Sequence, residues 1–331
     1  MKFKNLLVIL LVIIFAACGK KLNEKNIDEK YETVDLVLDW YPTSSSTPIY
    51  VALEKGYYEE EGIKLNIHMP SGVSDSLALV AAKKADLGYY YIHRTIMSIV
   101  NDDIPVKAIA ATLQGSVSTV MSLKESNIKR PKDLEGKTLG YCGGPLSEKM
   151  IDAMMKADGG DPSKVKLVDV GFELLSSLIT KKVDATLGGL VTHEVPLMEE
   201  KGYEVNYFFP KDFGVPEYPE TLIVANNDLI KERGEVYSKF LKATRRGFED
   251  VKANPEEAVQ ILLANQAKDQ FPLNENVERV ATKRYIPIME KFGPFLTINK
   301  DVFQKNVDWL YEKGFIKRKE NPEKLYKNLI N

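Results

Sequence analysis

Short segments of alternating apolar residues recur along this chain, and helical patterns separate them. Residues 34–38 and 63–67 have the period of two that is typical of strands. Residues 48–55 predict a short helix that ends at Gly56. Strands that alternate with helices favour a mainly parallel sheet covered by helices, so the pattern predicts an α/β fold.

Two stretches about a hundred residues apart follow one plan. Each has a helix, then a Lys-Lys-x-Asp element that leads into a strand, then another helix; the elements begin at Lys83 and Lys181. The simplest interpretation is two Rossmann-like α/β lobes built alike. An αβ turn as common as this one could also recur by chance, and the sequence alone leaves that alternative open.

The order of the predicted elements suggests where the chain passes between the lobes. Strand 221–225 returns to the first lobe after a second lobe that includes strand 137–141, and helices over 237–251, 275–291 and 300–313 follow. We therefore expect residues 33–122 and 221–331 to form the first lobe and residues 123–220 the second. The two crossover segments, near 119–126 and 218–221, would be the hinge of a central ligand cleft.

The amino terminus has the pattern of a secretory signal. Lys2 and Lys4 precede an uncharged apolar run over 6–15, which is short for a membrane span, and two small residues follow it. The segment 15–18 resembles the bacterial lipobox, with Phe15 where Leu is usual, and this resemblance implies acylation at Cys18. An ordinary cleavage site is the alternative. We expect a signal peptide over 1–17 and a polar, flexible tether over 18–32.

Composition and motifs exclude several function classes. The 45 basic and 47 acidic side chains nearly balance, so no electrostatic footprint for nucleic acid is visible. Acylation of Cys18 would leave Cys142 without a disulfide partner. No phosphate-binding loop and no Gly-x-Ser-x-Gly motif occurs, and His68, His93 and His193 are widely spaced. We expect no metal site, no cofactor and no catalytic residue.

The carboxyl ends of the predicted strands carry aromatic residues and glycines. Ligands of open α/β sheets bind at such ends, where backbone N–H groups are free. The candidates there are Trp40, Tyr41, Ser74, Tyr89, Tyr90, Tyr91, Tyr141, Gly143, Gly189 and Glu194. Each aromatic, taken alone, more often packs the core than contacts a ligand, and Glu194 could equally favour a helix dipole.

Taken together, these candidates indicate a planar and mostly uncharged ligand. Aromatic faces can sandwich a flat ring, and a carboxylate such as Glu194 can accept hydrogen bonds from an amino-heterocycle. We expect Trp40, Tyr89 and Tyr141 to meet across the cleft. His93 and His193 occupy equivalent places in the two repeats, and a structural role is expected for both.

Several motifs resemble a family of periplasmic binding proteins that includes sulfonate-binding proteins, thiamine-pyrimidine-binding lipoproteins and fungal pyrimidine synthases. The general motifs are LDWYP at 38–42, YVALEKGYY at 50–58, EGI at 61–63, DLEGK at 133–137 and WLYEKGFI at 309–316. Those that resemble the pyrimidine binders are GY at 140–141, PLSE at 145–148, DGGDP at 158–162, DVGF at 169–172 and HEVP at 193–196.

The resemblance implies a type II periplasmic binding protein that closes on its ligand. It implies a monomeric, lipid-anchored protein at the cell membrane, facing the periplasm or the exterior, that serves an ABC permease and its ATPase. The implied ligand is formylaminopyrimidine or hydroxymethylpyrimidine, with riboflavin, another heteroaromatic or a sulfonate as alternatives. Thr43 and Ser46 stand where pyrimidine-binding relatives usually have an asparagine and a histidine, so these two positions are expected to redirect specificity.

Two other classes stay open at this point. The same fold permits an enzyme like the pyrimidine synthases. These enzymes have a cysteine-rich cluster and a reactive histidine, whereas Cys142 stands alone and the loop after Trp40 has no histidine. A sensor or a surface adhesin could also use this fold, and the sequence does not separate it from a transport protein.

Overall fold

The computed structural model describes residues 31–330 and contains two five-stranded sheets. The predicted signal peptide, Cys18 and nearly all of the tether lie outside the described residues. The first sheet has the order β2-β1-β3-β10-β4. Its strands are β1 (Glu32–Val37), β2 (Ile63–His68), β3 (Leu87–Tyr91), β4 (Val106–Leu113) and β10 (Thr221–Asn226).

The second sheet has the order β7-β6-β8-β5-β9. Its strands are β5 (Ser118–Leu123), β6 (Thr138–Tyr141), β7 (Lys166–Asp169), β8 (Ala185–Leu190) and β9 (Val205–Phe208). In each sheet the first three strands are parallel, and the fourth pairs antiparallel with both of its neighbours. The predicted α/β fold with two lobes built alike is confirmed.

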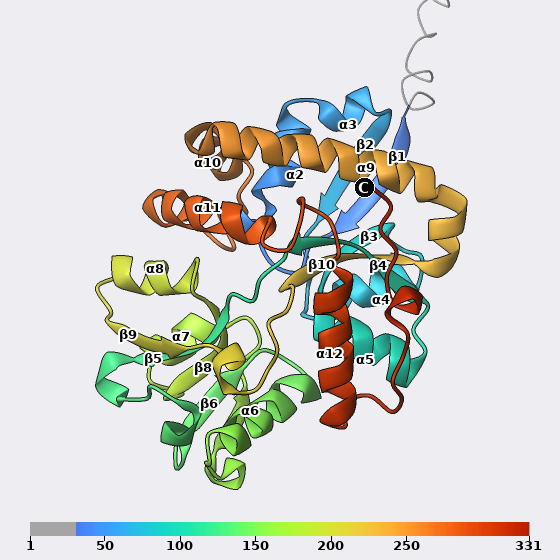
Figure 1. Ribbon diagram of the computed structural model, residues 1–331. Coiled ribbons are helices and arrows are strands. Elements are labelled where there is room, and N and C mark those ends of the chain that lie inside the picture. Colours follow the sequence, from blue (N-terminus) through green and yellow to red (C-terminus); the bar gives the residue numbers. More distant parts are fainter. Residues whose placement is uncertain (1–30, 331) are drawn as a thin grey trace, which may run out of the picture.

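Helices cover both sheets, and Figure 1 shows the two resulting bodies. The first lobe carries α2 (Thr47–Glu54), α3 (Tyr57–Glu60), α4 (Asp75–Ala81), α5 (Ile92–Asp102), α9 (Asn227–Ala253), α10 (Pro255–Ala264), α11 (Glu275–Met289) and α12 (Lys300–Glu312). The second lobe carries α6 (Pro145–Ala157), α7 (Leu174–Ile179) and α8 (Glu194–Glu200). Helix α8 lies beside α11, so the lobes also meet through helices.

The repeated Lys-Lys-x-Asp element has the same structure in both lobes. Lys83 and Lys181 have φ of 58° and 57°, which ends the preceding helix in a left-handed turn. The Asp86 carboxylate then accepts the backbone N–H of Asp35 on β1 at 2.9 Å. Its counterpart Asp184 accepts that of Thr138 on β6 at 2.8 Å. Each aspartate thus ties the turn to the neighbouring parallel strand, and the repeat is not a chance recurrence.

The first crossover lies earlier in the chain than the sequence pattern predicts. Strand β5 pairs with β8 and β9 of the second sheet, so the chain passes between the lobes within residues 114–117. The predicted crossover near 119–126 is wrong, as is a first lobe that extends to residue 122. The cause is the short sequence of β5, STVMSL, which contains no pattern that assigns it to either sheet. We call residues 31–113 and 221–330 the first lobe and residues 118–220 the second.

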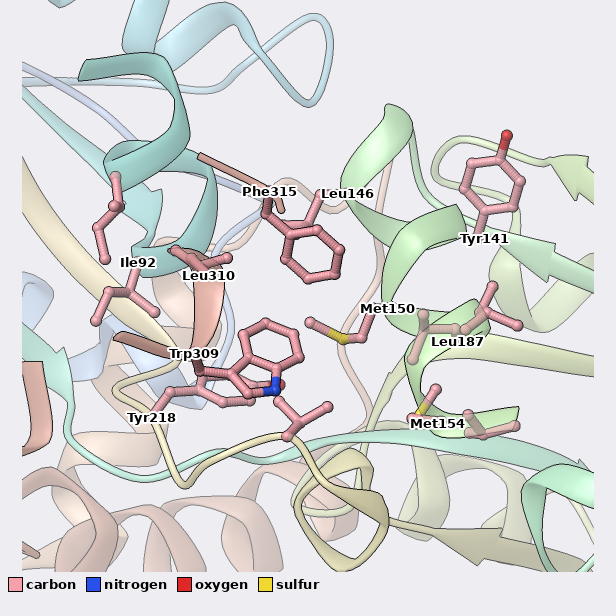
Figure 2. Close-up of a cluster of buried hydrophobic side chains, with 14 of the residues drawn as sticks. Ile92, Tyr141, Leu146, Met150, Met154, Leu187, Tyr218, Trp309, Leu310 and Phe315 are labelled. Carbon is pink, nitrogen blue, oxygen red and sulfur yellow. The ribbon is translucent and has the colours of Figure 1, made fainter. Parts of the chain in front are cut away.

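One apolar cluster joins the two lobes at α12. It contains Trp309 and Phe315 from the carboxyl-terminal part of the chain and Leu146 and Met150 from α6, as Figure 2 shows. The indole N–H of Trp309 donates to the backbone carbonyl of Gly214 at 2.8 Å. The lobes therefore share buried apolar surface on this side, in addition to the two crossover segments.

Candidate ligand-binding site

A cavity of about 160 Å³ lies between the lobes. Apolar side chains from both lobes line most of it, with Leu146, Met150 and Leu187 on the second lobe and Ile92 and Leu113 on the first. Several polar groups also reach it, among them carboxylates from each lobe. A mostly apolar cavity with a few convergent polar groups is the usual form of a small-molecule site.

Four of the predicted site residues line this cavity: Trp40, Thr43, Tyr91 and Glu194. Trp40 follows β1, and Tyr91 is the last residue of β3, so both lie at carboxyl ends of parallel strands. Thr43 precedes a single 3-10 turn over Ser44–Ser46, and Glu194 is the first residue of α8. The strand ends of both lobes thus face one cavity, as the fold requires.

Tyr89 and Tyr141 do not reach the cavity, and the predicted sandwich with Trp40 is wrong in these two members. Tyr89 is 2% exposed and packs in the core of the first lobe. Tyr141 is 7% exposed, and its hydroxyl donates to Glu148 of α6. Of the three consecutive tyrosines 89–91, only Tyr91, at the end of β3, lines the cavity. Tyr89 lies deeper in the strand, and side chains alternate between the two faces of a strand. Tyr90 is buried on the other face.

The other predicted residues support the cavity or lie apart from it. The Ser46 hydroxyl is buried and donates to the backbone carbonyl of Thr43 at 2.9 Å. Ser74 is exposed where α4 begins. Gly189 is buried, and its carbonyl accepts the hydroxyl of Thr119. Gly143 lies close to Val73 of the first lobe, since an added Cβ would stand 2.6 Å from its Cγ2.

Aromatic side chains do meet across the cleft, in a set that the strand-end pattern did not give. The ring of Phe172, from the loop before α7, stands edge to face against Trp40 with ring centroids 4.2 Å apart. Within the first lobe, Tyr41 stacks on Phe271 of the loop between α10 and α11, with ring centroids 5.3 Å apart. Phe172 is the last residue of the DVGF motif at 169–172, which resembles the pyrimidine binders, whereas Phe271 lies in a loop without periodicity and no local signal marks it.

Arg94 is another site residue that the sequence did not indicate. It lies on α5 of the first lobe and lines the cavity. Its guanidinium donates to the backbone carbonyls of Cys142 and Gly143 in the second lobe, each at 2.5 Å. This arginine therefore connects the lobes directly beside the ligand space.

Both oxygens of the Glu194 carboxylate are held by protein donors. One accepts the backbone N–H of Leu190 at 2.9 Å, and the other contacts Nδ1 of His193 at 3.0 Å. A carboxylate oxygen can accept more than one hydrogen bond, so both oxygens keep acceptor capacity toward the cavity. The carboxylate is consequently fixed in orientation before any ligand arrives.

The remaining ionisable groups at the cavity have shifted pKa values. Burial raises the pKa of Asp39 to about 6, although a hydrogen bond from the Tyr91 hydroxyl opposes the rise. Burial also raises the pKa of the Cys142 thiol to about 11. His93 has its pKa lowered to about 4 by burial, and its Nε2 contacts Oδ1 of Asn306 at 2.7 Å. The thiol and this imidazole are therefore uncharged at neutral pH.

Within residues 31–330, no group of three or more His, Cys, Asp or Glu side chains is arranged to hold a metal ion. In the same part of the chain, no helix has the length and apolar character needed to cross a membrane.

The chain is similar to proteins of one family over most of its length. The family model described as "NMT1/THI5 like" matches residues 43–258. A formylaminopyrimidine-binding protein of Halalkalibacterium halodurans is 36% identical over 93% of this chain and 93% of its own. A 4-amino-5-hydroxymethyl-2-methylpyrimidine phosphate synthase of Legionella pneumophila is 28% identical over 74% of this chain and 77% of its own.

Among solved structures, the alkanesulfonate-binding protein SsuA of Xanthomonas axonopodis pv. citri, bound to MOPS, superimposes with a TM-score of 0.68. The match covers 89% of this chain and 98% of that chain at 10% sequence identity. The likeness in structure therefore extends over both lobes. Together with the two lobes built alike and the cavity between them, these similarities place the chain in the NMT1/THI5 like family, with the fold of the periplasmic binding proteins.

Proposed function

We propose that this protein is the extracytoplasmic solute-binding lipoprotein of an ABC importer and that it binds a pyrimidine precursor of thiamine, formylaminopyrimidine or hydroxymethylpyrimidine. The observation that carries the proposal is the cavity between the lobes, which is mainly apolar and has the fixed carboxylate of Glu194 at its edge. An aminopyrimidine has an apolar ring face and an amino group that needs an acceptor.

The size of the cavity supports a single ring. A protein cavity of roughly 150 Å³ holds a benzene-sized molecule. The cavity here measures about 160 Å³, which suits one substituted six-membered ring. The three fused rings of riboflavin need considerably more space. We therefore favour a pyrimidine over riboflavin, the alternative that the sequence left open.

The polar groups support an amine-bearing ligand over a sulfonate. Glu194 and Asp39 both line the cavity, and a sulfonate would meet these carboxylates as an anion. Arg94 also lines the cavity, but its guanidinium already donates to the backbone carbonyls of Cys142 and Gly143. The exocyclic amino group of an aminopyrimidine would instead donate to Glu194. Thr43 and Ser45, with hydroxyls 3.0 Å apart, supply short polar side chains that can serve the ring nitrogens.

The relative that is named for formylaminopyrimidine binding supports the same ligand class, because it is similar along nearly the whole chain. The proposed anchor at Cys18 and the proposed permease and ATPase rest on the sequence pattern and the family resemblance. The lipid anchor would hold the protein on the outer side of the cell membrane, where the permease would receive its ligand.

The test is isothermal titration calorimetry of the mature protein, without residues 1–17, at pH 7.5. The ligands are formylaminopyrimidine, hydroxymethylpyrimidine, riboflavin and an alkanesulfonate. We expect saturable binding of one or both pyrimidines and a quenching or enhancement of Trp fluorescence, since Trp40 lines the cavity. Tight binding of riboflavin or of the sulfonate, with neither pyrimidine bound, would refute the proposed ligand.

A pyrimidine synthase is the second candidate, because relatives that carry this name share 28% identity. Two observations argue for binding over catalysis. The Cys142 thiol is protonated at neutral pH, since burial raises its pKa to about 11. The loop after Trp40 contains no histidine. A synthase forms the pyrimidine phosphate and does not consume it, so the test is mass spectrometry of a cell extract incubated with and without the protein. Equal amounts of 4-amino-5-hydroxymethyl-2-methylpyrimidine phosphate are expected, whereas more of it with the protein would favour the enzyme.

A further inference from the structure

His193 lies between two carboxylates that belong to different lobes. Its Nδ1 is 3.0 Å from Oε1 of Glu194, in its own lobe. Its Nε2 is 2.8 Å from Oε1 of Glu278, on α11 of the first lobe. The imidazole is 2% exposed and Glu278 is fully buried, so neither contact is replaced by water in this closed arrangement.

Glu278 is itself anchored to the loop that borders the ligand space. Its second carboxylate oxygen accepts the backbone N–H of Ser44 at 2.9 Å and the Ser44 hydroxyl at 2.5 Å. Ser44 adjoins Thr43, which lines the cavity. A continuous chain of buried hydrogen bonds therefore runs from the first-lobe side of the cavity, through Glu278 and His193, to Glu194 on the second-lobe side.

The geometry decides the charge of the imidazole. Ionised carboxylate oxygens only accept hydrogen bonds, and a neutral imidazole has one N–H. Only the imidazolium donates to Glu194 and Glu278 at the same time. Burial alone would lower the pKa of His193, but the two carboxylates outweigh burial and raise it to about 10. The ionic contacts around His193 thus favour a proton on it well above neutral pH.

The other groups around His193 leave this charge arrangement intact. The ring of Phe271 faces the imidazole, with ring centroids 6.3 Å apart. Tyr285 of α11 has its pKa raised well above 10 by burial and by the nearby carboxylates, so its hydroxyl stays neutral. Arg284, on the same helix, is exposed and donates to the carbonyl of Val191.

We propose that His193 is a positioning residue: as an imidazolium it orients Glu194 toward the ligand and binds Glu278 only when the lobes are closed, so that ligand binding is coupled to uptake of one proton. The inference rests on the proposed function and adds to it a coupling between the ligand contact, the closed state and pH. The proton comes from solvent, and no covalent bond changes.

The sign of the pH dependence follows from linkage. In the open form Glu278 is separated from His193, so the pKa of the imidazole falls below its closed value of about 10 and toward its ordinary value. Below the open-form pKa, His193 is charged in both forms and closure takes up no proton. Between the two values closure requires a proton, so affinity for the ligand falls as pH rises through this window.

The experiment is calorimetry with formylaminopyrimidine and hydroxymethylpyrimidine at pH 5.5 and 8, in pairs of buffers that differ in ionisation enthalpy. At pH 8 we expect net proton uptake by the wild type and much less at pH 5.5. His193→Gln should abolish the proton uptake that is due to the imidazole. It should also weaken ligand binding at pH 8 by roughly 5- to 150-fold, the usual range of coupling between sites. Proton uptake by the pyrimidine ring itself would persist in this variant.

Two further variants make the test specific. Glu278→Gln keeps the shape of the site and removes the first-lobe charge, so it should lower proton uptake at pH 8 as His193→Gln does. His68→Gln is the matched control, because His68 is also paired with a carboxylate, Asp35 at 2.8 Å, but lies on β2 away from the cavity. Circular dichroism checks that each variant is folded.

Equal affinity and equal proton uptake in the wild type and His193→Gln at pH 8 would overturn the inference while leaving pyrimidine binding intact.

If neither pyrimidine binds the wild type, the proposed function fails and the coupling is measured on the ligand-free protein. Small-angle scattering should then show expansion of the wild type as pH rises from 6 to 10 and a His193→Gln variant that is expanded throughout. A radius of gyration that changes with neither pH nor the variant would also overturn it.

Discussion

The indole of Trp40 and the ring of Phe172 meet edge to face, with ring centroids 4.2 Å apart and ring planes at 83°. Trp40 belongs to the first lobe and Phe172 to the second. The contact therefore exists only when the lobes are closed, and Trp40 is also a wall of the ligand cavity. A ligand that fills the cavity and the contact between these two rings stabilise the same state.

Removing this contact should weaken ligand binding. An aromatic pair contributes roughly 0.5–1.5 kcal/mol beyond area burial, so Phe172→Ala should lower affinity by roughly 2- to 10-fold, mainly through faster dissociation. Stopped-flow fluorescence measures the rate. Phe209→Ala is the matched control, since Phe209 makes an edge-to-face pair with Tyr207 outside the cleft. Equal dissociation rates in all three proteins would contradict this prediction.

Glu194 should contribute more to pyrimidine affinity than the contact between Trp40 and Phe172 does. Hydrogen bonds to a charged group contribute roughly 1.5–3 kcal/mol, so Glu194→Gln should weaken pyrimidine binding by roughly 10- to 150-fold. Titration calorimetry gives the affinity. Glu204→Gln provides the control, because Glu204 is an exposed carboxylate of the same lobe, paired with Lys124. An affinity for Glu194→Gln within twofold of the wild type would exclude a direct contact.

Gly143 should limit how closely the lobes approach. A methyl group at this position would stand 2.6 Å from Cγ2 of Val73 in the first lobe, and the φ of +59° adds backbone strain. Gly143→Ala should therefore weaken ligand binding. Adding Val73→Ala should restore part of the affinity, because it removes the clash but not the strain. If the double variant binds no better than Gly143→Ala, the clash is not the cause.

His93 should make the protein less stable in acid. Burial lowers its pKa in the folded state to about 4 from an ordinary value of 6.5, so the unfolded chain binds more protons between these values. Stability is complete above pH 6.5 and falls as pH decreases toward 4, by about 3 kcal/mol at most from this residue. Urea unfolding at pH 7 and pH 4.5 measures the loss. His93→Gln should show a smaller difference between the two pH values, and an unchanged difference would assign the acid sensitivity elsewhere.

Much of the fold could be predicted because its signals are local. The period of two gave strands β1 and β2, and Lys83 and Lys181 marked the repeated turn that ties helix to strand. The crossover was misplaced because the short sequence of β5, STVMSL, does not indicate which sheet it joins, and only pairing with β8 and β9 decides where it belongs. Pairing between distant strands leaves no mark in a short window of sequence.

The site was harder to predict, since it depends on contacts between the lobes. The position of Tyr91 at the end of β3 could be inferred, but the depth at which Tyr89 and Tyr141 are buried could not. Arg94 lines the cavity and contacts the second lobe, and Phe172 contacts Trp40, because the second lobe closes over the first. These contacts between the lobes cannot be inferred from the neighbouring residues in the sequence.

The apolar cluster around Trp309 has a consequence for the direction in which the cleft opens. At α12 the lobes share apolar side chains, whereas at α8 and α11 they meet through polar pairs such as Asn276 with Glu200 at 3.0 Å. Separating apolar surface in water is unfavourable, while polar pairs exchange their partners for water at small net cost. The lobes should therefore rotate about an axis near α12 and separate at α8 and α11. The ligand should enter and leave on that side, past Phe271.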